Sequence, residues 1–378
     1  MKRNFIIVFP EIGKGGAERV AASIVNHLID EGYNVIVISL GPKHDYQFLE
    51  LSEKVEIFHF SRKSKFDFSA FESIKVMFES RNVEYIFCID FFAQLYMSML
   101  RSHKKLNFKI VVNLHITIPK KKTDYLVNFL ASRFLRKADW VVFISKNQEK
   151  YISSRFLLNS ACKRTLIYNG IDTGKFIISN GEERIRLRES LLASSREDLL
   201  IIKVAGIRIE KDHETAIRAL SYFHQVYAYK PKLIFVGDGD QNIKKGLENL
   251  SRELELTDYI VFVGFNEAVN QYLSCADLFT LTSHSVETFS LAALEAMSCG
   301  LPAVLTNIGG ANEMINENNG SLSKPSDPID IAQKWHLALA KDFNRENIRA
   351  FVVNEFDITK MNANYLKLFQ HIEDSLMT

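Results

Sequence analysis

The chain has 378 residues, of which 47% are hydrophobic and 24% are charged, a balance that is typical of folded globular proteins and speaks against a disordered chain. This length suits two domains of roughly 150 to 200 residues each better than one core. The formal net charge is only +2, but residues 1–173 hold 26 Lys and Arg against 17 Asp and Glu, whereas the remainder holds 21 against 28. The asymmetry indicates that the two halves meet different partners.

The hydrophobic runs and the cysteines indicate the cellular compartment in which the protein is expected. The apolar run at residues 5–9 is too short for a secretion signal, and no stretch approaches the roughly 20 apolar residues that cross a bilayer. The cysteines are far apart and show no metal-ligand spacing: Cys88, Cys162, Cys275 and Cys299. We therefore expect a cytoplasmic protein with reduced thiols, no metal site and no cofactor.

Taken in chain order, short apolar runs alternate with longer amphipathic runs, which predicts strands that alternate with helices. In the first half the predicted segments are 5–9, 17–29, 35–40, 85–89, 92–100, 110–114 and 140–144. In the second half they are 199–205, 214–224, 232–236, 243–254, 260–263, 269–275, 278–282, 290–298 and 302–305. The turn-rich segment 169–174 separates the two series. The pattern predicts two doubly wound α/β domains with parallel sheets, and such domains bind ligands at the carboxyl ends of their strands, here in the cleft between them.

Two strand-end segments of the first half carry candidate ligand contacts. Gly13, Gly15 and Gly16 follow the first predicted strand, where glycine lets the backbone approach a ligand and a helix N-terminus favours anions. A dinucleotide fingerprint would need its third glycine at the position of Glu18, so the loop fits either a structural turn or a ligand contact. His115 ends the run 110–114 and is placed to donate a hydrogen bond to a sugar or phosphate.

The second half opens with a charged loop directly after its first predicted strand. It contains Arg208 and Lys211, which offer a bidentate fork and a point charge, the usual pair for holding a diphosphate. A solvated charged loop is the alternative interpretation.

Residues 283–297 are the most informative segment. Their helical part is apolar except for Glu295, and a charge in that position must have a partner or destabilise the fold by several kcal/mol. Glu287 lies eight residues earlier, and amides near the helix start would face the same space: those of Phe289, Ser290 and Leu291. Amides there bind phosphate oxygens and carboxylates accept hydrogen bonds from sugar hydroxyls, which together describe a nucleotide-sugar site. A capped, buried helix with one glutamate is the alternative.

These residues resemble the retaining glycosyltransferases of family 4, also called glycosyl transferases group 1. That family has the GT-B fold, in which two doubly wound, Rossmann-like parallel-sheet domains face a central cleft. The most specific part is the E-x7-E motif of Glu287 and Glu295, followed by residues 296–302. The resemblance runs along most of the chain and is carried also by 15–18, 138–145, 169–172, 236–239, Gly309, Gly310 and Glu313.

The resemblance implies a division of the chain and a set of site residues. It implies an acceptor-side domain at 1–172, a nucleotide-sugar-binding domain at 173–359, and a C-terminal helix from about 360 to 378 that packs on the first domain. The implied catalytic residues are His115, Arg208, Lys211 and Glu287. The implied donor-binding residues are Gly15, Gly16, Gly237, Phe289, Ser290, Leu291 and Glu295. No metal ligand is implied.

Individual roles follow from the same resemblance. Glu295 is expected to bind the ribose, Glu287 the donor sugar and Lys211 the diphosphate, while His115 lines the donor sugar.

The sequence departs from the family pattern at two positions. The usual diphosphate arginine would fall at Gly206, so we expect Arg208 to reach the phosphates instead, and Thr288 stands where the family often has glycine.

The expected reaction moves a sugar from a nucleoside diphosphate, more often UDP or GDP, to an acceptor with retention of configuration. Arg208, Lys211 and helix amides would stabilise the leaving diphosphate without a metal ion. A glycan or polyprenyl-diphosphate-linked acceptor in bacterial surface polysaccharide synthesis is expected, and no nucleic acid.

The basic first half also predicts contact with an anionic membrane. Residues 120–122 are lysines that precede an amphipathic stretch at 125–137, which fits peripheral binding to the inner face of the cell membrane. A helix packed in the core, with one solvated side, is the alternative.

Three other functions are alternatives for this sequence. A sugar-nucleotide epimerase would need further acid and base groups in the cleft. A catalytically inactive homologue that binds nucleotide sugars is compatible with the departure at Gly206. A dinucleotide-dependent oxidoreductase is disfavoured by Glu18 and by the lack of a Ser/Tyr/Lys cluster.

Overall fold

The strongly apolar runs form buried strands, because helices that cover both faces of a parallel sheet bury nearly every side chain of its strands. In the computed structural model the chain forms two compact units, which we call unit 1 (Met1–Asn169 and Thr359–Thr378) and unit 2 (Gly170–Ile358). The structure describes residues 4–13, 15–42, 51–64, 67–115, 122–136, 139–156, 162–192 and 198–377.

The sheet of unit 1 is parallel and follows the order β3-β2-β1-β4-β5-β6-β7 within the described residues. Its strands are β1 (Asn4–Phe9), β2 (Asn34–Ser39), β3 (Glu56–His59), β4 (Tyr85–Ile89), β5 (Lys109–Leu114), β6 (Trp140–Phe143) and β7 (Lys163–Leu166). β1 pairs with β2 from Asn4↔Asn34 to Phe9↔Ser39 and with β4 at Ile7↔Phe87. The strand order reverses between β1 and β4, so the topological switch point of this sheet lies at their carboxyl ends.

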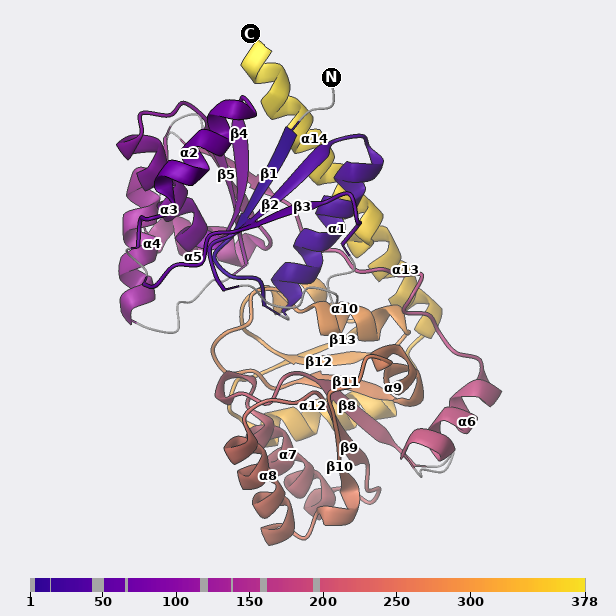
Figure 1. The fold of residues 1–378 in the computed structure, drawn as a ribbon. Helices are drawn as coiled ribbons and strands as arrows, with labels where there is room; N and C mark the ends of the chain where they lie inside the picture. The colour runs from indigo at the N-terminus through magenta and orange to yellow at the C-terminus, as the bar shows by residue number, and fades with distance from the viewer. Residues whose placement is uncertain are drawn as a thin grey trace. The chain divides into compact units, whose positions relative to one another are not determined.

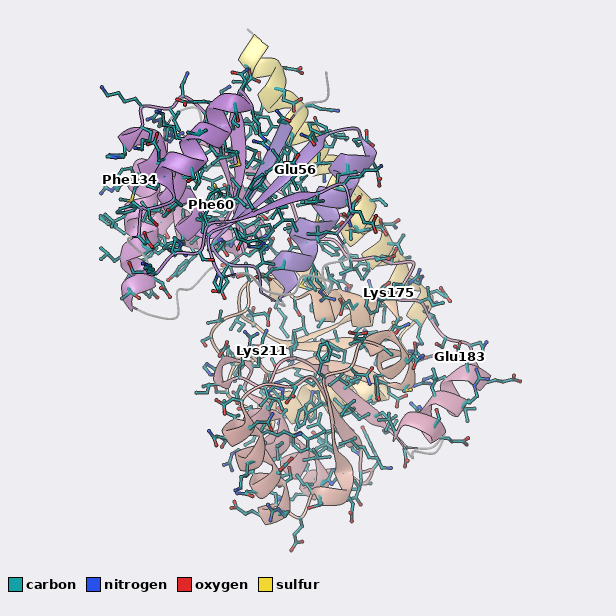
Figure 2. The ribbon with its side chains drawn as sticks, in the orientation of Figure 1. Glu56, Phe60, Phe134, Lys175, Glu183 and Lys211 are labelled. Atoms are coloured by element: carbon teal, nitrogen blue, oxygen red, sulfur yellow. The ribbon has the colours of Figure 1, made fainter. Side chains whose placement is uncertain are left out.

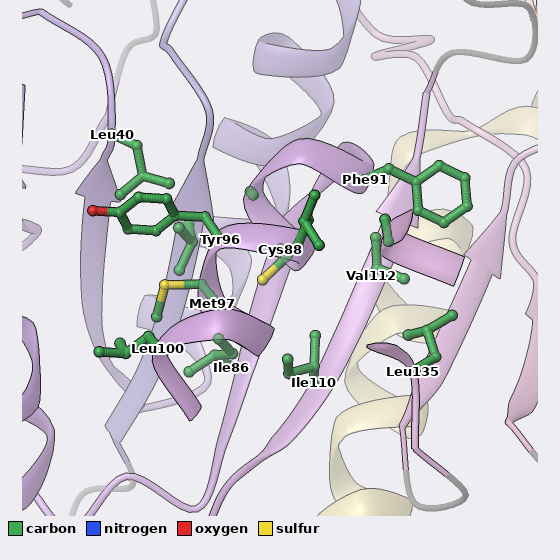
Figure 3. Close-up of a cluster of buried hydrophobic side chains, with 14 of the residues drawn as sticks. Leu40, Ile86, Cys88, Phe91, Tyr96, Met97, Leu100, Ile110, Val112 and Leu135 are labelled. Atoms are coloured by element: carbon green, nitrogen blue, oxygen red, sulfur yellow. The ribbon is translucent and has the colours of Figure 1, made fainter. Parts of the chain in front are cut away.

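The helices of unit 1 cover this sheet (Figure 1). They are α1 (Gly16–Asp30), α2 (Phe71–Ser80), α3 (Asp90–His103), α4 (Lys122–Phe134), α5 (Lys146–Arg155) and α14 (Ile358–Met377). On one face, Ile86 and Ile110 of the sheet join Met97 and Leu100 of α3 in a buried cluster (Figure 3).

The last helix, α14, packs on the sheet of unit 1 although it follows unit 2 in sequence. The Phe369 ring lies 4.7 Å from that of Phe5, and the Tyr85 hydroxyl donates to Glu373 Oε1 at 2.8 Å. The end of the chain therefore completes the hydrophobic core of unit 1.

The sheet of unit 2 is also parallel, in the order β10-β9-β8-β11-β12-β13 within the described residues. Its strands are β8 (Leu200–Val204), β9 (Lys232–Val236), β10 (Ile260–Gly264), β11 (Leu278–Leu281), β12 (Ala303–Thr306) and β13 (Gly320–Ser323). β8 and β11 are neighbours, with Leu278↔Ile201 and Phe279↔Ile202 in register. Here the order reverses between β8 and β11, so this pair marks the switch point of unit 2.

Helices flank the sheet of unit 2. They are α6 (Gly181–Leu192), α7 (His213–Val226), α8 (Gln241–Glu253), α9 (Val269–Cys275), α10 (Leu291–Ser298), α11 (Ala311–Met314), α12 (Pro328–Ala340) and α13 (Arg345–Phe356), with 3₁₀ turns η2 (Ile209–Lys211) and η3 (Thr257–Tyr259). α7 packs against α12, and α10 packs against α9 and α13. Trp335 of α12 is fully buried, and its Nε1 donates to Thr280 Oγ1 at 3.0 Å.

The two ends of unit 2 are joined to each other. The amide of Ile171 donates to the carbonyl of Phe356 at 3.0 Å, and the amide of Ile358 donates to the carbonyl of Ile171 at 2.9 Å. A Cβ on Gly170 would lie 2.8 Å from the carbonyl oxygen of Asp357, so only glycine fits this close approach.

The prediction of two doubly wound parallel-sheet domains is confirmed. Helix α10 begins at Leu291 rather than at the predicted residue 290, because Ser290 is its N-cap. The four cysteines are free and buried. None of the described helices combines the length and the apolar character that spanning a bilayer requires.

Candidate functional site

The loops that leave β8 and β11 carry the charged residues predicted in unit 2. Backbone hydrogen bonds tie these strand-end loops to one another. Ile207 N donates to Asp238 O at 3.0 Å, and His284 N donates to Glu210 O at 3.1 Å. The carboxyl edge of the sheet at its switch point is therefore one connected framework.

Two glycines keep this framework compact. Gly237 has φ of 136°, and a Cβ on it would lie 2.3 Å from the carbonyl oxygen of Ala205. Gly309 has φ of 54°, and its Cβ would lie 1.7 Å from the carbonyl oxygen of Glu287. Only glycine fits at either position. Gly237 thus has a structural role here, and its contact with a donor stays a prediction.

An ion pair between Lys211 and Glu287 lies at the centre of the site. Lys211 ends η2, after β8, and its Nζ lies 2.6 Å from Oε2 of Glu287, which follows β11. Ser283 Oγ donates to the same oxygen at 3.2 Å. The side chains of Lys211 and Glu287 are 16% and 15% exposed, so the pair is partly desolvated yet open to a ligand. Figure 2 labels Lys211 among the side chains of unit 2.

Arg208 approaches the space next to Gly206. Its side chain is 55% exposed, and its Nε lies 3.6 Å from Oε1 of Glu210. A Cβ built on Gly206 would lie 3.7 Å from this same Nε, and its nearest neighbour would be the carbonyl oxygen of Asp238 at 3.4 Å. The guanidinium therefore reaches the region into which a side chain at position 206 would extend.

Helix α10 begins beside the ion pair. Ser290 caps it, with Oγ accepting from Ala293 N at 3.3 Å, and Phe289 is buried with its ring 5.5 Å from that of Phe356. Glu295 lies one turn after Leu291 and is only 4% exposed. A small pocket beside the start of α10 is lined by residues that include Ser283, Glu287, Ser290 and Thr306.

The glycine loop of unit 1 is folded around Glu18. The amides of Gly13 and Gly15 donate to the two carboxylate oxygens of Glu18 at 3.2 and 3.1 Å, and α1 begins at Gly16. Glu18, at the third-glycine position of a dinucleotide fingerprint, thus binds amides of the loop itself. Donor contacts by Gly15 and Gly16 stay predictions.

His115 follows β5 in unit 1 and is held by Asp90. Its amide donates to Asp90 Oδ1 at 2.8 Å, and Asp90 opens α3 with φ of 62°, a conformation that is uncommon outside glycine. The His115 Nε2 atom is buried, and burial lowers the pKa of His115 to about 4. The imidazole is therefore neutral at physiological pH.

The structure brings together Arg208, Lys211, Glu287 and the start of α10 at the carboxyl edge of unit 2, while Gly15, Gly16 and His115 lie at the carboxyl edge of unit 1. Two further residues of these loops, Ser283 and Asp90, were not predicted individually as site residues. The signal for Asp90 was an acidic residue directly after the apolar run 85–89. The loop lysines Lys120 and Lys121 lie outside the described residues, as does Ala138.

Two family models match the chain, one for each half. Residues 14–175 match the model described as Glycosyltransferase Family 4, and residues 187–352 match the model described as Glycosyl transferases group 1.

Three curated relatives are similar to parts of the chain. An uncharacterized glycosyltransferase of Methanocaldococcus jannaschii is 32% identical over 51% of this chain and 48% of the relative. The N-acetyl-alpha-D-glucosaminyl L-malate synthase of Bacillus anthracis is 27% identical over 70% and 68%. A UDP-Gal:alpha-D-GlcNAc-diphosphoundecaprenol alpha-1,3-galactosyltransferase of Escherichia coli is 28% identical over 64% and 62%. The matched region thus spans about half to two thirds of the length of these relatives.

Solved structures share the fold along the whole chain. Anabaena HepE in complex with UDP superposes with a TM-score of 0.81 at 20% identity, covering 98% of this chain and 100% of that one. A glycosyltransferase from Rickettsia africae superposes with a TM-score of 0.82 at 22% identity and 98% coverage of both. With a family 4 match in the first half, a group 1 match in the second and this GT-B fold, the chain belongs to the group 1 glycosyltransferases of family 4.

Proposed function

We propose that the chain transfers a sugar from a nucleoside-diphosphate sugar to a hydroxyl acceptor, with retention of configuration and without a metal ion. The observation that carries this proposal is the Lys211–Glu287 pair beside the start of α10, at the switch point between β8 and β11. Cations and helix amides at such an edge suit a diphosphate, and carboxylates suit sugar hydroxyls.

In the proposed reaction the bond between the sugar C1 and the diphosphate oxygen breaks, and its electron pair goes to the departing phosphate. The acceptor oxygen bonds to C1 on the same face, and its proton passes to that phosphate. Lys211 and Arg208 stabilise the developing charge by preorganised electrostatics. Glu287 orients Lys211 and binds the sugar, Glu295 binds the ribose, and neutral His115 offers a hydrogen bond to the sugar.

Uridine is the donor base that the comparisons favour. Anabaena HepE is described in complexes with UDP and with UDP-glucose, and the Escherichia coli relative is named for UDP-galactose. We propose a UDP-sugar donor for this chain on that basis, with GDP as the second candidate.

We propose a lipid-linked or glycan acceptor at the cytoplasmic face of a membrane. The Escherichia coli relative is named for a diphosphoundecaprenol-linked acceptor, and two others are named for O-antigen biosynthesis. The first half of this chain is strongly basic, which suits a diphosphate-linked acceptor and anionic lipid. The free cysteines suit a reducing compartment.

A thermal-shift panel of UDP, GDP, ADP and CMP against the purified protein tests the donor site. We expect one diphosphate nucleotide to raise the melting temperature, and Lys211→Ala and Glu295→Ala to abolish the shift. A folded wild type that none of the nucleotides stabilises would contradict the proposal. With the matching nucleotide sugar and no acceptor, formation of an epimer would favour an epimerase instead.

A further inference from the structure

Lys203 is a fully buried lysine in β8, the central strand that leads to the site. Its exposed fraction is 0%, which is rare for lysine unless the ammonium has partners. Nζ donates to the carbonyls of Lys211 and Asp212, the latter at 3.2 Å, and to Thr282 Oγ1. Lys203 thus connects β8, the turn that carries Lys211 and the end of β11.

Three acceptors lie within hydrogen-bond distance of Nζ, which matches the three hydrogens of an ammonium. The Thr282 hydroxyl is also within hydrogen-bond distance of the carbonyl of Asp212, and when it donates there it is an acceptor for Lys203. A neutral amine has two hydrogens and would direct its lone pair at one of three acceptors, whereas an ammonium satisfies all three. Burial lowers the pKa of Lys203 well below its ordinary value, while the nearby carboxylates of Asp212 and Glu287 act in the opposite direction.

Neighbouring carboxylates are engaged elsewhere. The Asp212 carboxylate accepts from Thr215 N at 3.1 Å and from Thr215 Oγ1 at 2.7 Å, which caps α7. The Glu287 carboxylate is paired with Lys211. In the described part of the chain, no hydrogen bond or ion pair joins Lys203 to a carboxylate. The Asp212 and Glu287 carboxylates therefore act on Lys203 through space and not through a direct hydrogen bond.

We propose that Lys203 is a positioning residue for the donor diphosphate, holding the Lys211–Asp212 turn and placing a buried positive charge beneath it. The turn needs such support because Asp212 adopts φ of 47°, which is uncommon outside glycine. A buried charge is screened weakly, so it attracts an anion at the edge more strongly than a surface charge does. The inference rests on the proposed function, in which Lys211 binds the diphosphate.

Lys203→Met tests the inference by removing the charge while keeping most of the side-chain volume. The dissociation constants of UDP and of uridine are measured by calorimetry, with GDP and guanosine in their place if GDP is the nucleotide that stabilises the wild type. We expect a loss on the order of tenfold for the diphosphate and less than threefold for the nucleoside. Circular dichroism establishes that the variant is folded. If it does not fold, Lys203→Gln replaces it, with the same expectation.

Thr282→Val is the matched control, because it removes one partner of Lys203 but leaves the charge. We expect it to lower stability and to change diphosphate affinity less than threefold. Equal losses for diphosphate and nucleoside in folded Lys203→Met, or diphosphate affinity within twofold of wild type, overturn the inference. A wild type that binds neither UDP nor GDP overturns the proposed function itself, which distinguishes the two failures.

Discussion

At the scale of single residues, the geometry at Gly206 bears on the prediction that Arg208 replaces the diphosphate arginine expected at position 206. Position 206 has room for a side chain, since a Cβ there meets nothing closer than 3.4 Å. The Arg208 Nε already lies within 3.7 Å of that Cβ position. Because a guanidinium is planar and its stem is flexible, two positions on one loop can deliver it to the same phosphate.

A swap of the arginine between these positions tests this explanation. We expect Arg208→Ala to weaken binding of the donor nucleotide about tenfold, since a charge-assisted hydrogen bond contributes roughly 1.5–3 kcal/mol. Adding Gly206→Arg to that variant should recover affinity to within about threefold of wild type. Calorimetric titration of the three proteins measures this. If Arg208→Ala alone binds the nucleotide as tightly as wild type, Arg208 does not contact the phosphates.

The residues that sequence reasoning found are those whose chemistry conflicts with their surroundings, such as Glu295 in an apolar helix. Lys203 is also a charged residue in an apolar segment, the predicted strand 199–205, but it was not predicted as a site residue. A lysine in such a strand is equally compatible with an edge strand or a solvent-facing position. Only the tertiary structure shows that three acceptors surround it.

At the scale of elements, helix α4 has one face in the core and one face in solvent. Val127 and Ala131 are buried. On its other side Leu126, Phe129 and Phe134 are 57%, 39% and 39% exposed, and Phe134 is labelled on the outside of unit 1 in Figure 2. The Arg133 guanidinium lies 5.1 Å from the centre of the Phe129 ring. Exposed aromatic and aliphatic side chains beside a cation suit the interface of an anionic bilayer.

Vesicle flotation tests this role of α4. We expect the wild type to float with vesicles that contain anionic phosphatidylglycerol and not with neutral ones. Leu126→Ser combined with Phe129→Ser should reduce the bound fraction severalfold, because both apolar contacts are lost.

Val76→Ser is the matched control, since Val76 on α2 is also 57% exposed; it should leave binding unchanged. If the wild type binds neither kind of vesicle, the proposed membrane contact of α4 is wrong.

The same scale shows which elements the sequence could predict. Central strands such as β5 were found because both faces are buried and the run is apolar. The edge strands β3 (Glu56–His59) and β7 (Lys163–Leu166) were missed, since their charged and half-exposed residues interrupt any apolar pattern. Helix α6 was missed because its sequence is mostly polar and charged, and its place is set by Arg188, which bonds Asp277 at 2.6 Å.

At the scale of the whole molecule, buried neutral histidines link stability to pH. His213 is 2% exposed, and burial first and the nearby lysines second lower its pKa to about 2. The unfolded chain binds a proton on this histidine below about pH 6.5, and the folded chain does not. The stabilising contribution of neutral His213 is therefore present above about pH 6.5, and the free energy of unfolding falls as the pH drops below that value.

We expect His213 to account for about 2 kcal/mol of the stability lost between pH 6.5 and 5. The chain has two tryptophans, so Trp140→Phe leaves Trp335, which is buried in unit 2, as the fluorescent reporter. Denaturant unfolding in this background at several pH values, with and without His213→Phe, measures the difference. An identical pH dependence in both proteins would show that His213 titrates normally in the fold.

The paired ends of unit 2 also bear on how such proteins diversify. The first and last residues of unit 2 are hydrogen-bonded to each other, through the backbone of Ile171, Phe356 and Ile358. Residues 170–358 therefore resemble a domain inserted into unit 1, with the two ends of the insertion next to each other. Recombination at the two ends of this insertion would exchange the whole of unit 2, and with it the proposed preference for a sugar donor. The α14 helix, which contributes to the core of unit 1, would remain with unit 1, the proposed acceptor-side half.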